Sequence, residues 1–157
     1  MDALSLENIR CAAERLAPYV DPTPLVRCYE KRVIDAVGSD MLTLKLEFLQ
    51  RTGSFKVRGA INNILTRPDS ERGKGVTAVS AGNHAIAVAY AAQVLGVSAK
   101  VLMPRKASPV RIEKCRRYGA EVVFFDDIGE GFGKMNTIAI AEERTSCLVF
   151  RSDGADA

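Results

Sequence analysis

The 157-residue sequence is long enough for one domain with a hydrophobic core, and its 47% hydrophobic and 26% charged residues are ordinary for a soluble globular protein. A net charge of +3 is too small to indicate a nucleic-acid partner, and the longest apolar run, residues 85–92, is too short to span a membrane. The acidic residues Asp2 and Glu7 stand where a signal peptide would be basic, so we expect a cytoplasmic protein that binds no membrane.

The cysteines are widely spaced and form no CxxC pair. This spacing argues against a zinc site or a disulfide framework and is typical of free or buried thiols in a reducing compartment. We therefore expect no metal site. The cysteines are Cys11, Cys28, Cys115 and Cys147.

The first expected element is a helix capped by Ser5, because apolar residues follow at helical spacing. Pro18 ends this helix, and Pro22 and Pro24 make the chain after it an extended arm. Residues 42, 44 and 46 are all leucine, and this alternation predicts a strand. The apolar face of the first helix consists of Leu6, Ile9, Ala13, Leu16 and Ala17.

The segment from Thr52 to Ala60 places Lys56 in the first turn of a helix, directly after a glycine-serine turn. Ser54 is a good N-cap residue, and the apolar positions after it have helical spacing. A cation is disfavoured at the positive end of a helix dipole, which makes a neutral, nucleophilic lysine easier to reach. The alternative is an ordinary surface lysine beside a helix cap. The apolar positions are Val57, Ala60, Ile61, Ile64 and Leu65.

Beyond residue 75 the sequence alternates between strands and helices, which predicts an open, doubly wound parallel sheet of the α/β class. Gly96 and Gly119 are placed as helix C-caps, and Ser108 with Pro109 as a helix start. Ligands of such sheets bind at the carboxyl ends of the strands. The expected strands are residues 76–80, 99–103, 120–125 and 147–150, and the expected helices are 83–95, 109–118 and 133–143.

The loop Ser80-Ala81-Gly82-Asn83-His84 links a buried strand to a nearly all-apolar helix. Its successive backbone N–H groups form a natural cradle for an anion, and a carboxylate suits it best. The alternative is simply a well-capped strand-to-helix turn. Lys56 and this loop each follow a strand and open a helix, so we expect the fold to bring them to one edge. His84 is the only histidine, and we expect a hydrogen-bonding or capping group rather than a general base.

A second glycine-containing segment, residues 129–133, follows the strand expected at 120–125. It superficially resembles a dinucleotide loop, but its spacing is GxGxG rather than GxGxxG. Asp126, Asp127 and Glu130 would also place three negative charges around a pyrophosphate. We therefore predict a flexible, solvent-exposed connector here.

The sequence contains KLEFLQ at residues 45–50 running into TGSFKVRGA at 52–60, followed by SAGNH at 80–84. Two motifs in this order resemble the threonine/serine dehydratase and serine racemase family of fold-type II pyridoxal phosphate enzymes. The resemblance extends from residues 23–25 to the strand expected at 147–150. It implies that residues 42–146 form the smaller, α/β domain of such an enzyme. Residues 1–41 would be a helix and arm belonging to the larger domain, and residues 147–157 the beginning of the return to it.

The resemblance implies pyridoxal 5′-phosphate as the cofactor and a small hydroxy amino acid as the substrate. Lys56 would hold the cofactor and then remove the α-proton, and Phe55 and Asn83 would contact the cofactor. Loss of the β-hydroxyl would yield a 2-oxo acid and ammonia, whereas proton return to the other face would racemise the substrate. Serine, threonine and hydroxyaspartate all stay open as substrates. The residues implied to bind the substrate are Ser80, Ala81, Gly82, Asn83 and His84.

The sequence also departs from this family. Family members continue into the larger domain, which supplies a glycine-rich loop for the cofactor phosphate and a small polar residue facing the pyridine nitrogen. Neither has a counterpart here. A glycine-rich loop of that kind is not expected, because no two glycines are consecutive in the sequence. We therefore expect the chain alone to be weak or inactive, as a natural truncation, a degenerate gene product or one half of a split protein.

The first helix and the arm would then lack the larger domain that they normally cover. Such uncovered apolar surface predicts a homo-oligomer or a partner chain that supplies the missing half. The alternatives to an enzyme are a non-catalytic remnant or interaction module of the family and, more distantly, an unrelated small α/β binding protein. The residues expected to be uncovered are Leu6, Ile9, Leu16, Leu25 and Val26.

Overall fold

A four-stranded parallel sheet forms the centre of the computed structural model, which describes residues 5–39 and 41–147. The strand order is β5-β4-β3-β6, and every neighbouring pair is parallel, as the alternating pattern predicts. The strands are β3 (Val76–Val79), β4 (Ala99–Pro104), β5 (Glu121–Phe125) and β6 (Thr145–Ser146).

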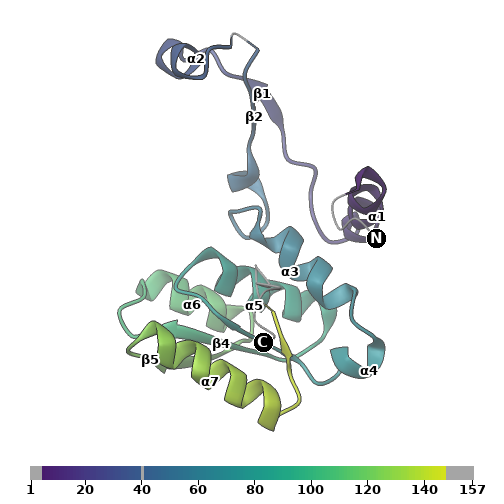
Figure 1. Cartoon of the computed structure of the whole chain (residues 1–157), viewed down its shortest axis with the longest axis vertical. Helices are drawn as coiled ribbons and strands as arrows, with labels where there is room; N and C mark the ends of the chain where they lie inside the picture. Colours follow the sequence, from purple (N-terminus) through teal and green to yellow (C-terminus); the bar gives the residue numbers. More distant parts are fainter. Residues whose placement is uncertain (1–4, 40, 148–157) are drawn as a thin grey trace, which may run out of the picture.

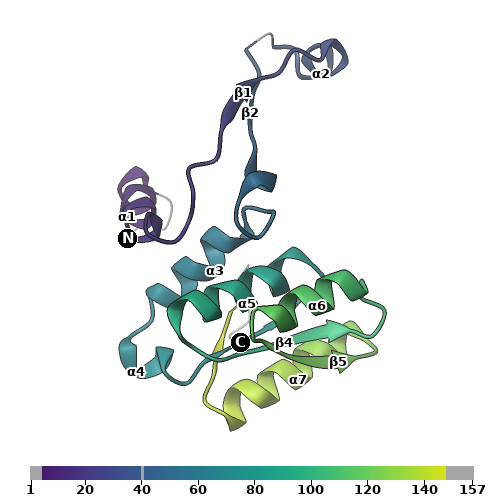
Figure 2. The same ribbon diagram turned by 180° about the vertical axis from the view of Figure 1, so that it is seen from behind.

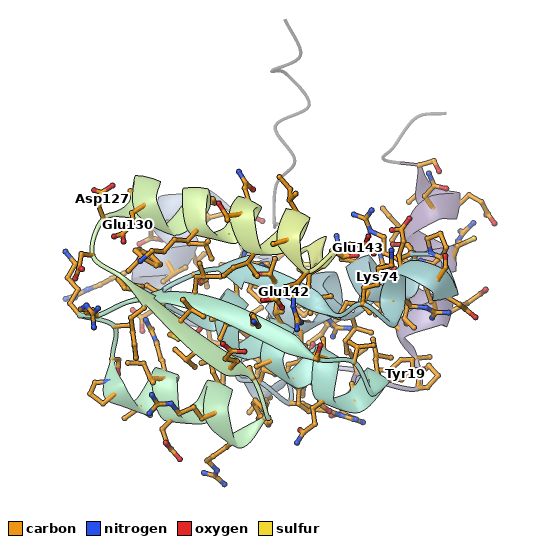
Figure 3. The ribbon with its side chains drawn as sticks, turned by 90° about the horizontal axis from the view of Figure 1, so that it is seen from below. Tyr19, Lys74, Asp127, Glu130, Glu142 and Glu143 are labelled. Atoms are coloured by element: carbon orange, nitrogen blue, oxygen red, sulfur yellow. The ribbon has the colours of Figure 1, made fainter. Side chains whose placement is uncertain are left out.

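Helices cover both faces of this sheet, which confirms the doubly wound α/β fold (Figures 1 and 2). One face carries α3 (Lys56–Leu65), α5 (Asn83–Leu95) and α6 (Pro109–Arg117), and a short helix α4 (Asp69–Arg72) leads from α3 into β3. The other face carries α7 (Ile128–Ala141). Figure 3 looks along the sheet and shows α7 and α6 on opposite sides of it.

The core follows this layering. The larger cluster of buried residues lies under α3 and α5 and includes Ile61, Val88 and Val101. Helix α5 is almost entirely apolar and buried, as expected of a helix enclosed on most sides by other elements. A smaller cluster on the α7 side contains Phe125 and Met135, among others.

A separate two-stranded ribbon projects from the α/β body (Figure 1). Its strands β1 (Leu25–Arg27) and β2 (Thr43–Lys45) pair antiparallel, and α2 (Lys31–Val37) lies between them in the chain. The expectation that Lys56 follows a strand of the parallel sheet is therefore wrong. Alternating leucines indicate a strand but not its partner, and β2 pairs with the arm instead. A short 3-10 turn, η1 (Glu47–Leu49), then leads toward Lys56.

The N-terminal helix α1 (Leu6–Leu16) begins as predicted, because the Ser5 hydroxyl accepts the N–H of Asn8 at 3.1 Å. Leu6 and Ile9 are 72% and 56% exposed, which confirms their expected lack of cover. Leu25 and Val26 are exposed as well. Leu16 contradicts the expectation, since it is only 7% exposed and belongs to the larger core cluster. The last turn of α1 lies against α3, where Arg15 donates to the Asn62 side chain at 2.6 Å.

The prediction of a connector at residues 129–133 is wrong, because this segment forms the first turns of α7, although all of its residues except Gly131 are exposed as predicted. The Asp127 carboxylate accepts the N–H groups of Gly129 and Glu130, and the Glu130 carboxylate reaches back to the Asp127 N–H. Two of the three acids that argue against a phosphate loop, Asp127 and Glu130, thus form the capping box of a helix (Figure 3).

Packing explains one of the glycines in that segment. Gly131 lies against the ring of Phe125, where an added Cβ atom would come within 2.8 Å of a ring carbon. Gly131 therefore lets α7 approach the last residue of β5 closely.

Lys134 and the backbone N–H groups of Asp126 and Asp127 lower the pKa of Glu130 to about 2.

The last described strand is β6, and it begins before the position expected for it. The Cys147 N–H donates to the Thr77 carbonyl at 2.8 Å, so the pairing with β3 continues to that residue. Residues 148–150 of the expected strand lie outside the described residues. All four cysteines are free, as predicted. In the described part of the chain, no helix is long and apolar enough to cross a membrane, and no cluster of metal-binding side chains occurs.

Candidate functional site

Lys56 is the first residue of α3, as the sequence predicts. Ser54 does not cap this helix, because Phe55 occupies the N-cap position and no side-chain capping hydrogen bond occurs there among the described residues. The chain turns at Gly53, whose φ of +81° favours glycine, and the Ser54 hydroxyl is buried without a partner in the described residues. The Lys56 ammonium lies 5.0 Å from the centre of the exposed Phe55 ring.

A network of charged side chains holds the start of α3 against the arm. The Arg58 guanidinium donates two hydrogen bonds of 3.0 Å to the two oxygens of Glu47, and the Thr23 hydroxyl donates to the same carboxylate at 2.6 Å. These bonds lower the pKa of Glu47, the Arg58 bond most of all. The KLEFLQ and TGSFKVRGA segments therefore meet through Glu47 and Arg58, which orients the helix that begins at Lys56.

The 80–84 loop leaves the carboxyl end of β3 and opens α5. The Ser80 hydroxyl accepts the N–H of Gly82 at 3.1 Å, so one member of the expected cradle is already in use. Among the described residues, the backbone N–H groups of Ala81, Asn83 and His84 have no acceptor. The Asn83 side chain is exposed. A row of unpaired N–H groups at the start of a 13-residue helix can bind an anion.

His84 is buried, with 9% of its surface exposed. Its Nε2 atom lies 2.8 Å from the carbonyl oxygen of Cys147, across the gap between α5 and the end of β6. Its Nδ1 atom is buried and has no hydrogen-bond partner in the described part of the chain. Burial lowers the pKa of His84, the bond to Cys147 raises it, and the charge of Lys56 lowers it further. The net shift is downward, so the ring is neutral at neutral pH.

Lys56 and His84 line the same pocket, of about 290 Å³, beside α3. The structure thus brings the lysine and the end of the 80–84 loop together, as the sequence predicts. Ser80, Ala81, Gly82 and Asn83 do not line this pocket. The roles of these residues and of Phe55 toward a cofactor or substrate stay predictions. The pocket is lined by Phe55, Lys56, Gly59, Ala60, Asn62, Asn63, Thr66, His84 and Cys147.

Sequence reasoning missed part of this lining. Gly59, Ala60 and Asn63 follow Lys56 at helical i+3, i+4 and i+7 spacing, so periodicity alone could have placed them on its face of α3. Cys147 lies 63 residues after His84, and only the pairing of β6 with β3 brings it to the pocket. No local signal in the sequence indicates this contact.

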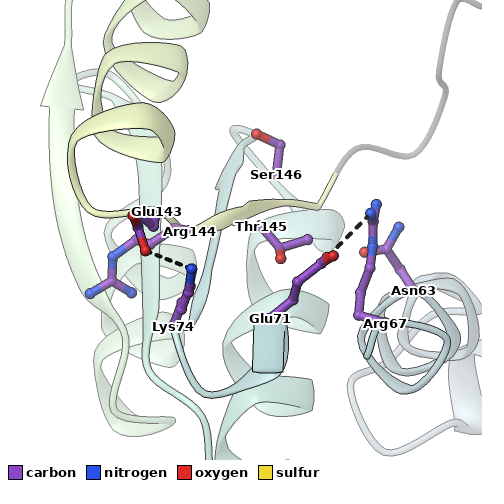
Figure 4. Close-up of a pocket in the computed structure, with 8 residues that line it drawn as sticks. All are labelled: Asn63, Arg67, Glu71, Lys74, Glu143, Arg144, Thr145 and Ser146. Carbon is purple, nitrogen blue, oxygen red and sulfur yellow. Dashed lines mark ion pairs between the residues drawn. The ribbon is translucent and has the colours of Figure 1, made fainter. Parts of the chain in front are cut away.

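A second pocket, of about 360 Å³, lies at the amino ends of β3 and β6 (Figure 4). Its charged side chains largely pair with one another. Lys74 lies 2.6 Å from Glu143, and Arg67 lies 3.8 Å from Glu71. None of the predicted site residues lines it. Because ligands of open α/β sheets bind at the carboxyl ends of the strands, the pocket at Lys56 is the candidate site.

Comparison with protein families gives a match between residues 16–155 and the family described as pyridoxal-phosphate dependent enzymes. A phenylserine dehydratase from Ralstonia pickettii is 42% identical over 147 residues, covering 92% of this chain and 44% of that protein. An L-threo-3-hydroxyaspartate ammonia-lyase from a Pseudomonas species is 37% identical over 156 residues, covering 99% of this chain and 48% of that protein.

Solved structures agree with these matches. Maize serine racemase superposes with a TM-score of 0.85 at 33% identity, covering 96% of this chain and 45% of that one. A serine racemase from Dictyostelium discoideum superposes with a TM-score of 0.80 at 30% identity, covering 91% of this chain and 46% of that one. The chain therefore spans just under half the length of the relatives that it matches.

Proposed function

The chain belongs to the pyridoxal-phosphate dependent enzyme family, and on that premise we propose that it forms the lysine-bearing side of an ammonia-lyase site. The observation that carries this proposal is the meeting of Lys56 and His84 in one pocket at the start of α5. The matched relatives include dehydratases, ammonia-lyases and racemases of 3-hydroxy amino acids. We propose the same class of substrate here, with β-elimination as the reaction.

The described residues can supply part of a cofactor site, namely a lysine, an amide donor and a loop of backbone N–H groups. Lys56 would hold pyridoxal phosphate through its amine, and the exposed amide of Asn83 would donate to the phenolic oxygen of the cofactor. The unpaired N–H groups of the 80–84 loop suit the carboxylate of an amino acid. When bound, the cofactor supplies an electron-withdrawing ring that takes up the electrons released at the substrate's α-carbon.

The residues of the chain then have separate tasks. The loop would hold the substrate's carboxylate and so orient the α-hydrogen, and the Lys56 amine would accept that proton at Nζ. Loss of the β-hydroxyl would lead to a 2-oxo acid and ammonia, whereas return of the proton to the opposite face would give the other enantiomer. Serine, threonine and hydroxyaspartate are the substrates to compare, because they differ only beyond the β-carbon.

We expect the 157-residue chain alone to bind pyridoxal phosphate weakly and to release little ammonia. The phosphate requires several charge-assisted hydrogen bonds, each worth about 1.5–3 kcal/mol, and these residues contain no glycine-rich loop to supply them. Absorbance titration with the cofactor and ammonia release from the three amino acids measure both properties. Robust turnover by the isolated chain would contradict this expectation.

An interaction role is the second candidate, because large apolar side chains are exposed on α1 and the ribbon. Tyr29 and Met41 are at least three-quarters exposed, and Leu6 and Leu25 are each about two-thirds exposed or more. We expect such a surface to drive self-association or to recruit a chain carrying the remaining part of the site. Sedimentation measures the size in solution. A compact monomer would count against both forms of this proposal.

Replacing Asn83 with alanine should weaken cofactor binding or shift the absorbance of the bound cofactor. The expected loss is that of one charge-assisted hydrogen bond, about 1.5–3 kcal/mol or roughly ten- to hundredfold in affinity. The same absorbance titration measures it. Asn136→Ala is the matched control, because Asn136 is also exposed but lies on α7, on the other face of the sheet. Equal titrations of the two variants would show that Asn83 does not contact the cofactor.

A further inference from the structure

The ring of His84 has one nitrogen in use and one that is not. A backbone carbonyl can only accept a hydrogen bond, so the 2.8 Å contact with Cys147 requires Nε2 to carry the hydrogen. Because the ring is neutral, Nδ1 then carries a lone pair and can only accept. It is buried without a donor among the described residues. A buried acceptor without a hydrogen-bond donor costs free energy. A donor that reached Nδ1 would remove this cost.

Lys56 is the one lysine or arginine in the described lining of the pocket. Burial raises the pKa of the Cys147 thiol to about 12, so this thiol stays neutral. The remaining polar groups of the described lining are the neutral side chains of Asn62, Asn63 and Thr66. Lys56 and His84 both line this pocket, and the charge of Lys56 also lowers the pKa of His84.

Lys56 has a different neighbour in the structure described here. Its ammonium lies over the exposed ring of Phe55, 5.0 Å from the ring centre. Contacts of this kind at exposed sites contribute only about 0.5–1 kcal/mol. A lysine that first holds a cofactor and then carries a proton needs a second position for its freed amine.

We propose that His84 is a positioning residue for Lys56, whose amine donates to the Nδ1 lone pair of His84 when it turns from the Phe55 ring into the pocket. The bond from Nε2 to Cys147 locks the tautomer that makes this possible. A neutral ring receives the ammonium without adding a second charge, whereas an imidazolium would repel it. This inference rests on the proposed function of Lys56, and it assigns His84 a role beyond its hydrogen bond to Cys147.

Nitrogen-15 NMR tests the contact without cofactor, and His84 is the only histidine, so its ring signals need no assignment among others. We expect a protonated Nε2 and an unprotonated Nδ1, whose signal is shifted by a hydrogen bond in the fraction of molecules in which the Lys56 amine has turned from the Phe55 ring into the pocket. In Lys56→Met, whose unbranched side chain is one atom shorter and carries no charge, the Nδ1 signal should move to the position of a free lone pair. The pKa of His84 should rise in this variant, because a neighbouring positive charge is gone. An unchanged Nδ1 signal, or a protonated Nδ1, would overturn the proposal.

Two substitutions of His84 separate its two nitrogens. Glutamine places an amide near the position of Nε2, so His84→Gln keeps the donor to Cys147 but loses the acceptor. Asparagine places its amide near Nδ1, so His84→Asn keeps an acceptor but loses the bond to Cys147. We expect His84→Gln to melt near the wild-type temperature, yet to couple pyridoxal phosphate to Lys56 about two- to tenfold more slowly, as trapped with borohydride. His84→Asn should show the reverse pattern.

The two variants also distinguish this proposal from the proposed function. If the wild-type chain gives no label at Lys56, the proposed function fails, and the nitrogen-15 comparison still decides the role of His84. If the label appears but both variants couple at the wild-type rate, the positioning role fails while the lysine's role stands. If His84 were purely structural, its substitutions would lower the melting temperature, and His84→Gln and His84→Asn would couple the cofactor at the same rate.

Discussion

Lys56→Ala is expected to remove the site-specific reaction of this chain with pyridoxal phosphate. Treatment with the cofactor and borohydride should label the peptide containing Lys56 in the wild type, because this lysine opens α3 in the pocket beside His84. The substitution should lower the total label at least about tenfold, since a positioned amine reacts far more readily than one in free solution. Under the proposed role of Lys56 in moving the α-proton, its loss should also cost about 10²–10⁴-fold in any rate of ammonia release. Peptide mapping by mass spectrometry and ammonia release measure the two effects.

Lys106→Ala is the matched control for this experiment. Lys106 is exposed between β4 and α6 and makes no ion pair or hydrogen bond within the described residues. Its removal should leave the label at Lys56 unchanged. Neither substitution alters a buried apolar side chain, so both variants should unfold within about 0.5 kcal/mol of the wild type. A label distributed over many lysines and insensitive to Lys56→Ala would contradict the assignment.

Gly75→Ala is expected to give the largest loss of stability among single methyl additions in the described chain. Gly75 has a φ of +84°, which costs an alanine about 1–2 kcal/mol. The new Cβ would lie 2.7 Å from the Ser98 carbonyl oxygen and 2.5 Å from the Arg144 guanidinium. A backbone carbonyl cannot turn away as a side chain can, and overpacking of this kind costs about 1–3 kcal/mol more. The sum is about 2–5 kcal/mol, measurable by urea unfolding.

The position of Gly75 explains why this loss should reach the candidate site. Its carbonyl accepts the Thr145 N–H at 3.0 Å, and the next residue, Val76, donates to the Ser98 carbonyl at 2.9 Å. Gly75 therefore joins the starts of β3, β4 and β6, and β3 carries the 80–84 loop at its other end. Gly96→Ala is the control, because Gly96 has a φ of +68° but open space at its Cβ position. It should lose only about 1–2 kcal/mol. Equal losses would show that the close approach at Gly75 is unimportant.

The sequence by itself determined the parallel α/β arrangement beyond residue 75. Helix α5 was predicted with the bounds that the structure has, because a nearly all-apolar segment between a loop and Gly96 leaves few alternatives. Gly96 adopts the left-handed conformation expected of a C-cap. Lys56 likewise opens a helix as expected. These features depend on neighbours within a few turns of the chain, so periodicity and capping contain enough information to find them.

Local patterns predict the wrong structure where one pattern fits two structures. Alternating leucines at residues 42–46 suit any strand, and only tertiary pairing placed β2 beside β1 in a ribbon. The glycines at 129–133 suggested a loop. The capping box at Asp127 and the fit of Gly131 against Phe125 make the segment a helix instead. A glycine's low helix propensity was outweighed by packing that is visible only in three dimensions.

Only the tertiary structure decided how the candidate site is assembled. The sequence indicated Lys56 and the 80–84 loop as separate motifs, and the packing of α3 against α5 placed Lys56 and His84 in one pocket. Pairing of β6 with β3 carried Cys147 to the Nε2 atom of His84 and left Nδ1 as a buried lone pair. Such a contact depends on strand order, which follows from the burial of the whole sheet. The spacing of residues along the chain cannot specify which distant carbonyl a buried histidine will meet.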